Sequence, residues 1–217
     1  MTTVPGAGGP PLPWRWSAVG LDALAGAVRH AAGPVRPAVV GVDGHSSSGK
    51  STLAPRLADA LTSTGAPAAV LHTDDLAWHH GVFAWDVTLR EHVLPEVRAG
   101  RPLAHRPPGW VARDREGAVE LPGDLAFLVV EGVGAGQPSV ADLLDVVVWV
   151  ETDEPTRLAR DLVRVAAGET TPEDYASWMA EENAYVTAAR PWEQATLVVN
   201  GSGSIDHDPA TEVVLAL

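Results

Sequence analysis

The chain has 217 residues, a formal net charge of −13 at pH 7 and 46% hydrophobic residues. This length indicates one domain with enough apolar side chains to form a buried core. The sequence contains no cysteine, which excludes disulfides, a thiol nucleophile and a cysteine-ligated zinc site. The acidic balance argues against nucleic acid and anionic membranes as partners, because both attract basic surfaces.

The sequence also lacks the features of a membrane span or an export signal. Its longest apolar run, residues 125–130, is far shorter than the roughly 20 residues that a spanning helix needs. Residues 1–13 carry no positive charge and no apolar stretch, so we expect a cytoplasmic location. The glycine- and proline-rich start predicts a mobile arm at residues 1–16, followed by a single domain at residues 17–217.

Hydrophobic patterns along the chain alternate between helical and extended segments. Helical spacing predicts helices at residues 17–32 (with Ser17 as N-cap), 50–62, 87–98, 155–167 and 172–189. Short apolar runs predict strands at residues 38–42, 68–71, 125–130, 146–150 and 196–199. Most of these runs do not alternate with polar residues, which is typical of parallel strands covered on both faces. The fold class is therefore α/β, with a doubly wound five-stranded parallel sheet. Residues 101–122, with four prolines, form either a long loop or a small insertion.

One segment matches a phosphate-binding motif. Residues 44–51 fit the pattern G-x-x-x-x-G-K-[ST], between a predicted strand and a predicted helix. In such a loop, backbone N–H groups and the helix N-terminus face the phosphates, Lys50 reaches the β and γ phosphates, and Ser51 can bind Mg²⁺. The motif assigns nucleotide binding to Gly44, His45, Ser46, Ser47, Ser48, Gly49, Lys50, Ser51 and Thr52.

Lys50 is the only lysine in the chain. A guanine-reading Asn-Lys-x-Asp motif therefore cannot occur here, which removes one route to GTP and favours ATP with Mg²⁺ as the cofactors. The sequence leaves other routes to GTP open.

Four segments together resemble the uridine kinase/phosphoribulokinase branch of the P-loop kinases. They are residues 41–52 with the phosphate loop, residues 71–76 (Leu-His-Thr-Asp-Asp-Leu), residues 129–133 (Val-Val-Glu-Gly-Val), and residues 151–164 with Arg157, Arg160 and Arg164. The resemblance spans roughly residues 38 to 200. It implies a helical lid at residues 153–190 and phosphoryl transfer from ATP to a hydroxyl of a nucleoside-like small molecule.

The resemblance also implies roles for individual residues. Asp74 follows a predicted strand, at the sheet edge where ligands bind, and corresponds to the general base, with Asp75 as the alternative. Glu131 would hold Mg²⁺ through water or orient the phosphate loop, unless it makes only a structural hydrogen bond. Arg157 and Arg160 share one helix face and would stabilise the transferring phosphoryl group, unless they form a solvated face paired with nearby acidic residues.

The acceptor side is less like that family. Where uridine kinases have a Tyr-Asp-Phe segment followed by a histidine, residues 106–115 retain an aromatic residue and a later arginine. Candidate acceptor-binding residues are Asp75, Trp85, Asp86, Trp110, Arg113 and Arg115. Residues 98–115 carry five arginines, which either bind an acidic acceptor or form a solvated insertion.

Two alternatives to a nucleoside kinase stay open. The acceptor could be a non-nucleoside alcohol such as a sugar, a vitamin precursor or an antibiotic. The domain could instead be a nucleotide-binding regulatory module without an acceptor. The presence of Asp74 argues against the regulatory module, because a protein that only binds nucleotide needs no general base.

Overall fold

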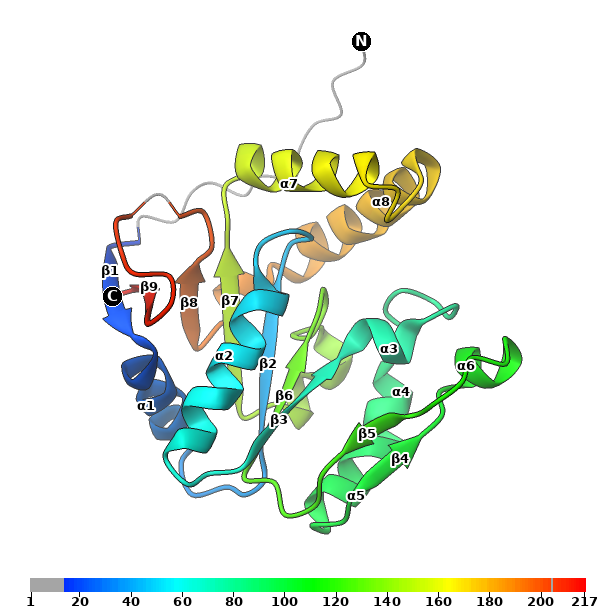
Figure 1. Ribbon diagram of the computed structural model, residues 1–217, viewed down its shortest axis with the longest axis horizontal. Coiled ribbons are helices and arrows are strands. Elements are labelled where there is room, and N and C mark those ends of the chain that lie inside the picture. Colours follow the sequence, from blue (N-terminus) through cyan, green and yellow to red (C-terminus); the bar gives the residue numbers. More distant parts are fainter. Residues whose placement is uncertain (1–13, 204) are drawn as a thin grey trace.

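A seven-stranded sheet forms the centre of the computed structural model, which describes residues 14–203 and 205–217 (Figure 1). Its strand order is β1-β9-β8-β7-β2-β6-β3. The strands are β1 (Trp16–Gly20), β2 (Ala38–Gly44), β3 (Ala68–His72), β6 (Phe127–Glu131), β7 (Val146–Glu151), β8 (Leu197–Asn200) and β9 (Glu212–Ala216). The strands β8, β7, β2, β6 and β3 pair in parallel, which confirms the five-stranded parallel sheet. The antiparallel strands β9 and β1 extend it at one edge.

Helices cover both faces of the sheet. The helices are α1 (Leu21–Ala32), α2 (Lys50–Ser63), α3 (Thr73–Ala77), α4 (Asp86–Thr88), α5 (Leu94–Arg98), α6 (Pro108–Ala112), α7 (Glu154–Ala166) and α8 (Pro172–Ala189). A π-helical turn, Leu89–Val93, joins α4 to α5, and short 3₁₀ turns lie at Pro138–Leu143 and Pro191–Glu193. None of the helices in the described part of the chain is long and apolar enough to cross a membrane.

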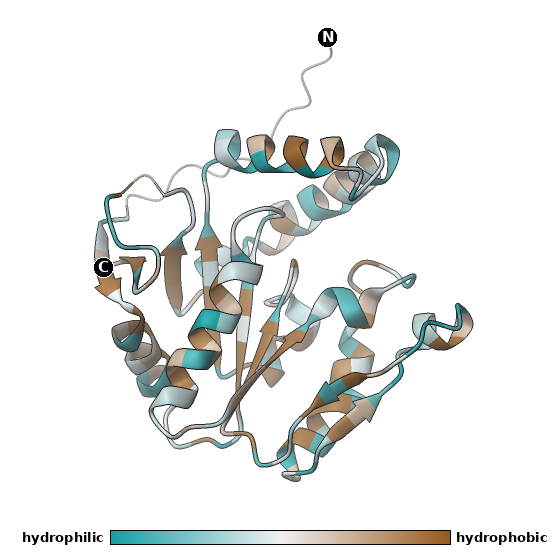
Figure 2. Ribbon diagram, in the orientation of Figure 1, coloured by the Kyte–Doolittle hydropathy of each residue, from teal (hydrophilic) through white to brown (hydrophobic). Residues whose placement is uncertain are grey.

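Alternate residues of the central strands enter two separate cores. Val40 packs with Leu24 of α1 and Leu57 of α2 on one face, whereas Val39 packs with Leu89 and Leu94 on the other. Successive side chains of a strand point to opposite faces, so a strand buried on both faces consists of apolar residues without alternation. Figure 2 shows these apolar strands in brown.

The predicted start of the domain needs correction. Residues 16–20 form an edge strand that pairs with β9, and the helix begins only at Leu21, so Ser17 is not its N-cap. Trp16 lies in this strand and Trp14 packs against its ring, so the predicted arm at residues 1–16 is too long. Residues 1–13 of that arm lie outside the described residues. The spacing of apolar residues in this segment also suits an edge strand, and pairing with the end of the chain decides between the two.

Residues 101–122 form a small insertion. The strands β4 (Leu103–His105) and β5 (Val119–Leu121) make an antiparallel ribbon, and α6 lies between them in the chain. The ribbon contributes Leu103 and Leu121 to the second core. The Nε1–H of Trp110 on α6 donates to the carbonyl of Asp75 at 2.8 Å. The insertion is thereby joined to α3.

Gly109 allows α6 to approach α3 this closely. A Cβ atom at this position would lie 1.9 Å from the carbonyl oxygen of Trp78. Because the obstacle is backbone, we expect Gly109→Ala to lower the free energy of unfolding by about 1–3 kcal/mol. Gly26 is the matched control, since it lies inside α1 with only the end of the Arg29 side chain within 4 Å. Gly26→Ala should leave stability unchanged or raise it by up to about 1 kcal/mol. Urea unfolding of both variants checks this, and equal stabilities would contradict it.

Candidate nucleotide site

The phosphate loop connects the end of β2 to the start of α2 (Figure 1). Gly49 has φ 107°, a backbone conformation that favours glycine, and it places the N-terminus of α2 directly after the turn. The Lys50 side chain is only 6% exposed and donates to the carbonyl of His45 at 2.6 Å. Burial lowers the pKa of Lys50, opposed by the negative charges of Glu131 and Asp43. A buried ammonium group with a single hydrogen bond is suited to receive an anion.

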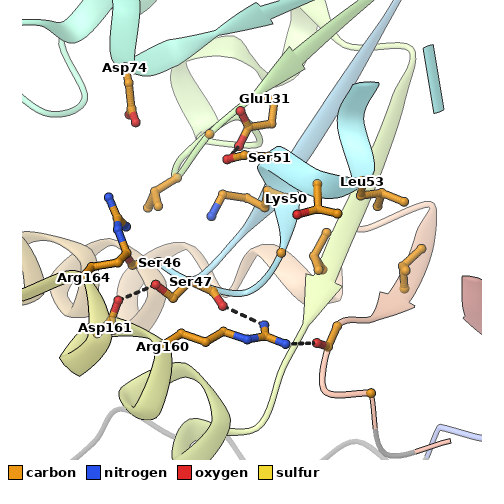
Figure 3. A pocket seen from close by; sticks show the side chains of 18 of the residues that line it. Ser46, Ser47, Lys50, Ser51, Leu53, Asp74, Glu131, Arg160, Asp161 and Arg164 are labelled. Carbon is orange, nitrogen blue, oxygen red and sulfur yellow. Dashed lines mark hydrogen bonds between the residues drawn. The ribbon is translucent and has the colours of Figure 1, made fainter. Parts of the chain in front are cut away.

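A cavity of about 950 Å³ lies over this loop (Figure 3). From the loop it is lined by Ser46, Ser47, Gly49, Lys50, Ser51 and Thr52. Three further predicted nucleotide residues, Gly44, His45 and Ser48, are buried and do not line it. Asp74, Glu131, Arg160 and Arg164 line the cavity from other elements.

Ser51 and Glu131 lie together at the cavity wall. The Ser51 hydroxyl donates to Glu131 Oε1 at 3.0 Å, and Glu131 Oε2 lies 2.6 Å from His72 Nδ1. Burial alone would raise the pKa of Glu131, but the hydrogen bond from His72, the charge of Lys50 and the hydrogen bond from Ser51 outweigh it and lower that pKa. The wall therefore presents a carboxylate and a hydroxyl oxygen, the ligand types that Mg²⁺ prefers, so these residues fit a magnesium ion. Among residues 14–203 and 205–217, no three His, Asp or Glu side chains form a metal-binding group by themselves.

Asp74 lies in the first turn of α3, directly after β3. Its carboxylate is free of ion pairs among the described residues and lines the cavity (Figure 3). Partial burial, reinforced by the charge of Glu131, raises the pKa of Asp74. Asp75 instead accepts from Arg115 at 3.2 Å and does not line the cavity. Of the two aspartates, only Asp74 is placed to act in the cavity.

Of the two predicted catalytic arginines, only Arg160 lines the cavity. Arg160 lines the cavity and donates to the carbonyls of Ser47 at 2.9 Å and Gly201 at 2.8 Å. Arg157 is buried, donates to the carbonyl of Thr152 at 3.1 Å and does not line the cavity. Arg157 lies 3.9 Å from the buried carboxylate of Glu182, whereas Arg164 lines the cavity together with Arg160.

Three predicted acceptor-binding residues come together beside α3. The guanidinium of Arg115 lies 3.6 Å from the ring centroid of Trp110 and 4.9 Å from that of Trp78, in addition to its ion pair with Asp75. Stacking of this kind favours a planar cation between aromatic rings. Trp110 is buried in the second core, and none of Asp75, Trp78, Trp110 and Arg115 lines the cavity that contains Asp74.

The other three acceptor candidates do not join this cluster. The structure contradicts the prediction for Trp85, because its side chain is fully buried in the second core and has no surface for a ligand. Asp86 accepts from the backbone N–H of Val87 at the start of α4. Arg113 is exposed at the end of α6.

Sequence reasoning missed several polar residues of the site. His72 is the register partner of Glu131 in the parallel pair β3–β6, so the shared strand ends could have indicated it. Asp43 precedes the first glycine of the loop and accepts from Gly134 N–H at 2.9 Å, Gly136 N–H at 3.0 Å and Tyr185 O–H at 2.6 Å. It joins β2 to the segment after Glu131 and to α8.

Comparisons with known proteins agree with this architecture. No protein-family model matches the sequence, and no curated protein matches it. A possible uridine kinase from Bacillus stearothermophilus has a similar structure, with a TM-score of 0.55, 20% identity, and coverage of 82% of this chain and 96% of that one. A structure described as a fructose transport system kinase from Silicibacter sp. TM1040 has a TM-score of 0.51, 24% identity, and coverage of 82% and 95%. This likeness confirms the resemblance at the level of the fold: the chain has the same fold as these two structures, both of which are described as kinases.

Proposed function

We propose that this protein is a kinase that uses ATP and Mg²⁺ to phosphorylate a hydroxyl group of a nucleoside-like small molecule. The observation that carries this proposal is the placement of Asp74 in the same cavity as Lys50 and the Ser51–Glu131 pair. Phosphoryl transfer to an alcohol needs a phosphate site and a proton acceptor, and this cavity contains residues suited to both tasks.

Each side chain has a definite task in this reaction. The loop N–H groups and Lys50 bind the β and γ phosphates. Arg160 and Arg164 face the loop from α7 and neutralise the negative charge of the transferring group. Asp74 accepts the proton of the acceptor hydroxyl as its oxygen attacks in line. Ser51 and Glu131 would hold Mg²⁺, which when bound neutralises phosphate charge.

The acceptor class is supported by the fold likeness to a possible uridine kinase. A sugar is the second candidate, because a structure described as a fructose transport system kinase has a comparable TM-score. The regulatory module is the weakest alternative, since it gives no task to Asp74.

ADP release from Mg²⁺–ATP, measured across nucleosides, sugars, vitamin precursors and antibiotic alcohols, tests the proposal. We expect one acceptor class to stimulate release at least about tenfold over the rate without acceptor. The stimulation should disappear in Asp74→Asn. ATP binding without stimulation by any acceptor in the panel would count against a kinase and favour the regulatory module.

A further inference from the structure

A buried carboxylate of α8 contacts the phosphate loop. Glu182 is 0% exposed, although it lies 137 residues after its loop partner His45. Its Oε1 is 2.7 Å from His45 Nδ1, and its Oε2 accepts from the backbone N–H of Ser46 at 3.0 Å and from Trp178 Nε1 at 3.2 Å. Arg157 lies 3.9 Å from the same carboxylate. A carboxylate this deeply buried is stable only with several such partners.

We propose that Glu182 is a positioning residue that holds the first half of the phosphate loop in its nucleotide-binding shape, so that nucleotide affinity depends on its contacts with His45 and Ser46. This inference rests on the proposed function only in taking ATP as the ligand. Glu182 does not line the cavity, so any effect on ATP must act through His45 and Ser46.

The backbone of the loop explains why such support is needed. Ser47 has φ 56°, a left-handed conformation that is unfavourable for a residue with a side chain. Its hydroxyl donates to Asp161 Oδ1 at 2.5 Å and its carbonyl accepts from Arg160, both on α7. Contacts from α7 therefore fix Ser47, and Glu182 fixes the two residues before it.

The pKa of Glu182 agrees with this role. Burial alone would raise that pKa, but the hydrogen bond and charge of His45, the N–H of Ser46 and the charge of Lys50 outweigh it and lower the pKa. Glu182 is therefore an acceptor at neutral pH. Glutamine at this position has one acceptor oxygen, so its NH₂ group would face one of the N–H donors.

The experiment compares Glu182→Gln with two control variants. Glu181→Gln removes the same charge from the neighbouring exposed position of α8. Val186→Ala weakens the packing of α8, because Val186 is 1% exposed, without changing a hydrogen bond to the loop. For each protein we would measure the Kd for ATP by calorimetry, the thermal midpoint, and the exchange rate of the Ser46 amide without nucleotide.

We expect Glu182→Gln to raise the Kd for ATP and the Ser46 exchange rate by about tenfold each, the effect of one lost charge-assisted hydrogen bond. Glu181→Gln should change neither. Val186→Ala should lower the thermal midpoint while its Kd stays within about twofold of the wild type, since affinity responds to the loop and not to stability. If Glu182→Gln does not fold, His45→Ala tests the same contact from the loop and should raise the Kd.

An unchanged Kd in Glu182→Gln would overturn the inference, as would an equal rise in Val186→Ala. Wild-type protein that fails to bind ATP would instead refute the proposed function. In that case the Ser46 exchange rate still decides the positioning role, because it is measured without nucleotide. An exchange rate in Glu182→Gln equal to that of the wild type would then reject it.

Discussion

Asp74→Asn is expected to lower kcat by about 100- to 10,000-fold while the Kd for ATP stays within about twofold. Asparagine keeps the shape of the side chain but cannot take the proton of the acceptor hydroxyl. The carboxylate has no ion pair to lose among the described residues, so the loop should keep its geometry. Steady-state kinetics with the acceptor identified by ADP release, together with calorimetry, measure the two quantities separately.

Asp75→Asn is the matched control for this variant. It removes the neighbouring carboxylate and breaks the ion pair with Arg115 but leaves the cavity intact. We expect a small loss of kcat, because a partly exposed ion pair contributes little to stability. If Asp74→Asn weakened ATP binding as much as turnover, Asp74 would be a structural or metal-binding residue and its role as base would be rejected.

The pH profile gives a second measure of the same base. Partial burial and the charge of Glu131 raise the pKa of Asp74. Asp74 can accept a proton only when its carboxyl group is deprotonated. Activity is therefore lost as the pH falls through this raised pKa. The acid limb of kcat/KM should lie above the ordinary aspartate pKa of about 3.9.

Lys50→Met should weaken ATP binding and lower kcat/KM by about 100- to 1,000-fold together. The buried ammonium is the cation that the loop directs at the phosphates, and methionine retains only its apolar stem. Lys50→Arg should restore little of the activity, because a planar guanidinium does not replace a compact ammonium 2.6 Å from the His45 carbonyl. Calorimetry with ATP and steady-state kinetics check both variants.

The stability of Lys50→Met separates this role from a structural one. Burial lowers the pKa of Lys50, so the charged form is disfavoured in the folded protein and its removal should not lower the thermal midpoint. Arg29→Met, which removes a partly buried cation near the end of α1, should leave ATP binding unchanged. A folded Lys50→Met that binds ATP like the wild type would contradict the assignment of the loop.

The sequence predicts the parallel sheet well because each buried strand has its own local signal. The runs at residues 38–42 and 146–150 are apolar throughout, and the structure extends each of them by only one or two residues. The edge strand β1 has no comparable signal, whereas β9 overlaps an apolar run at residues 213–217 that the predicted elements did not include. Residues 16–20 become a strand because residues 212–216, at the other end of the chain, pair with them. The ribbon at residues 103–121 depends in the same way on pairing between separated segments.

The residues of the candidate site also differ in whether a local sequence signal identifies them. Lys50, Ser51, Asp74 and Glu131 belong to short segments with a recognisable order, so they could be named before the fold was known. Glu182 and Tyr185 act on the loop across 137 and 142 residues of chain, and only folding brings them there. Trp85 shows the opposite failure, since an aromatic residue in an acceptor-like segment proved to be core.

Because Lys50 is the only lysine in the chain, chemical labelling of amines can report on the phosphate site. Apart from any α-amino group, an amine-selective reagent finds a single side chain to modify, and that side chain is 6% exposed. Lys50 lines the cavity, so a reagent small enough to enter it would label this side chain. One mass increment in an intact-mass spectrum would then count the fraction of molecules with an empty phosphate site, without a tag, a dye or knowledge of the acceptor.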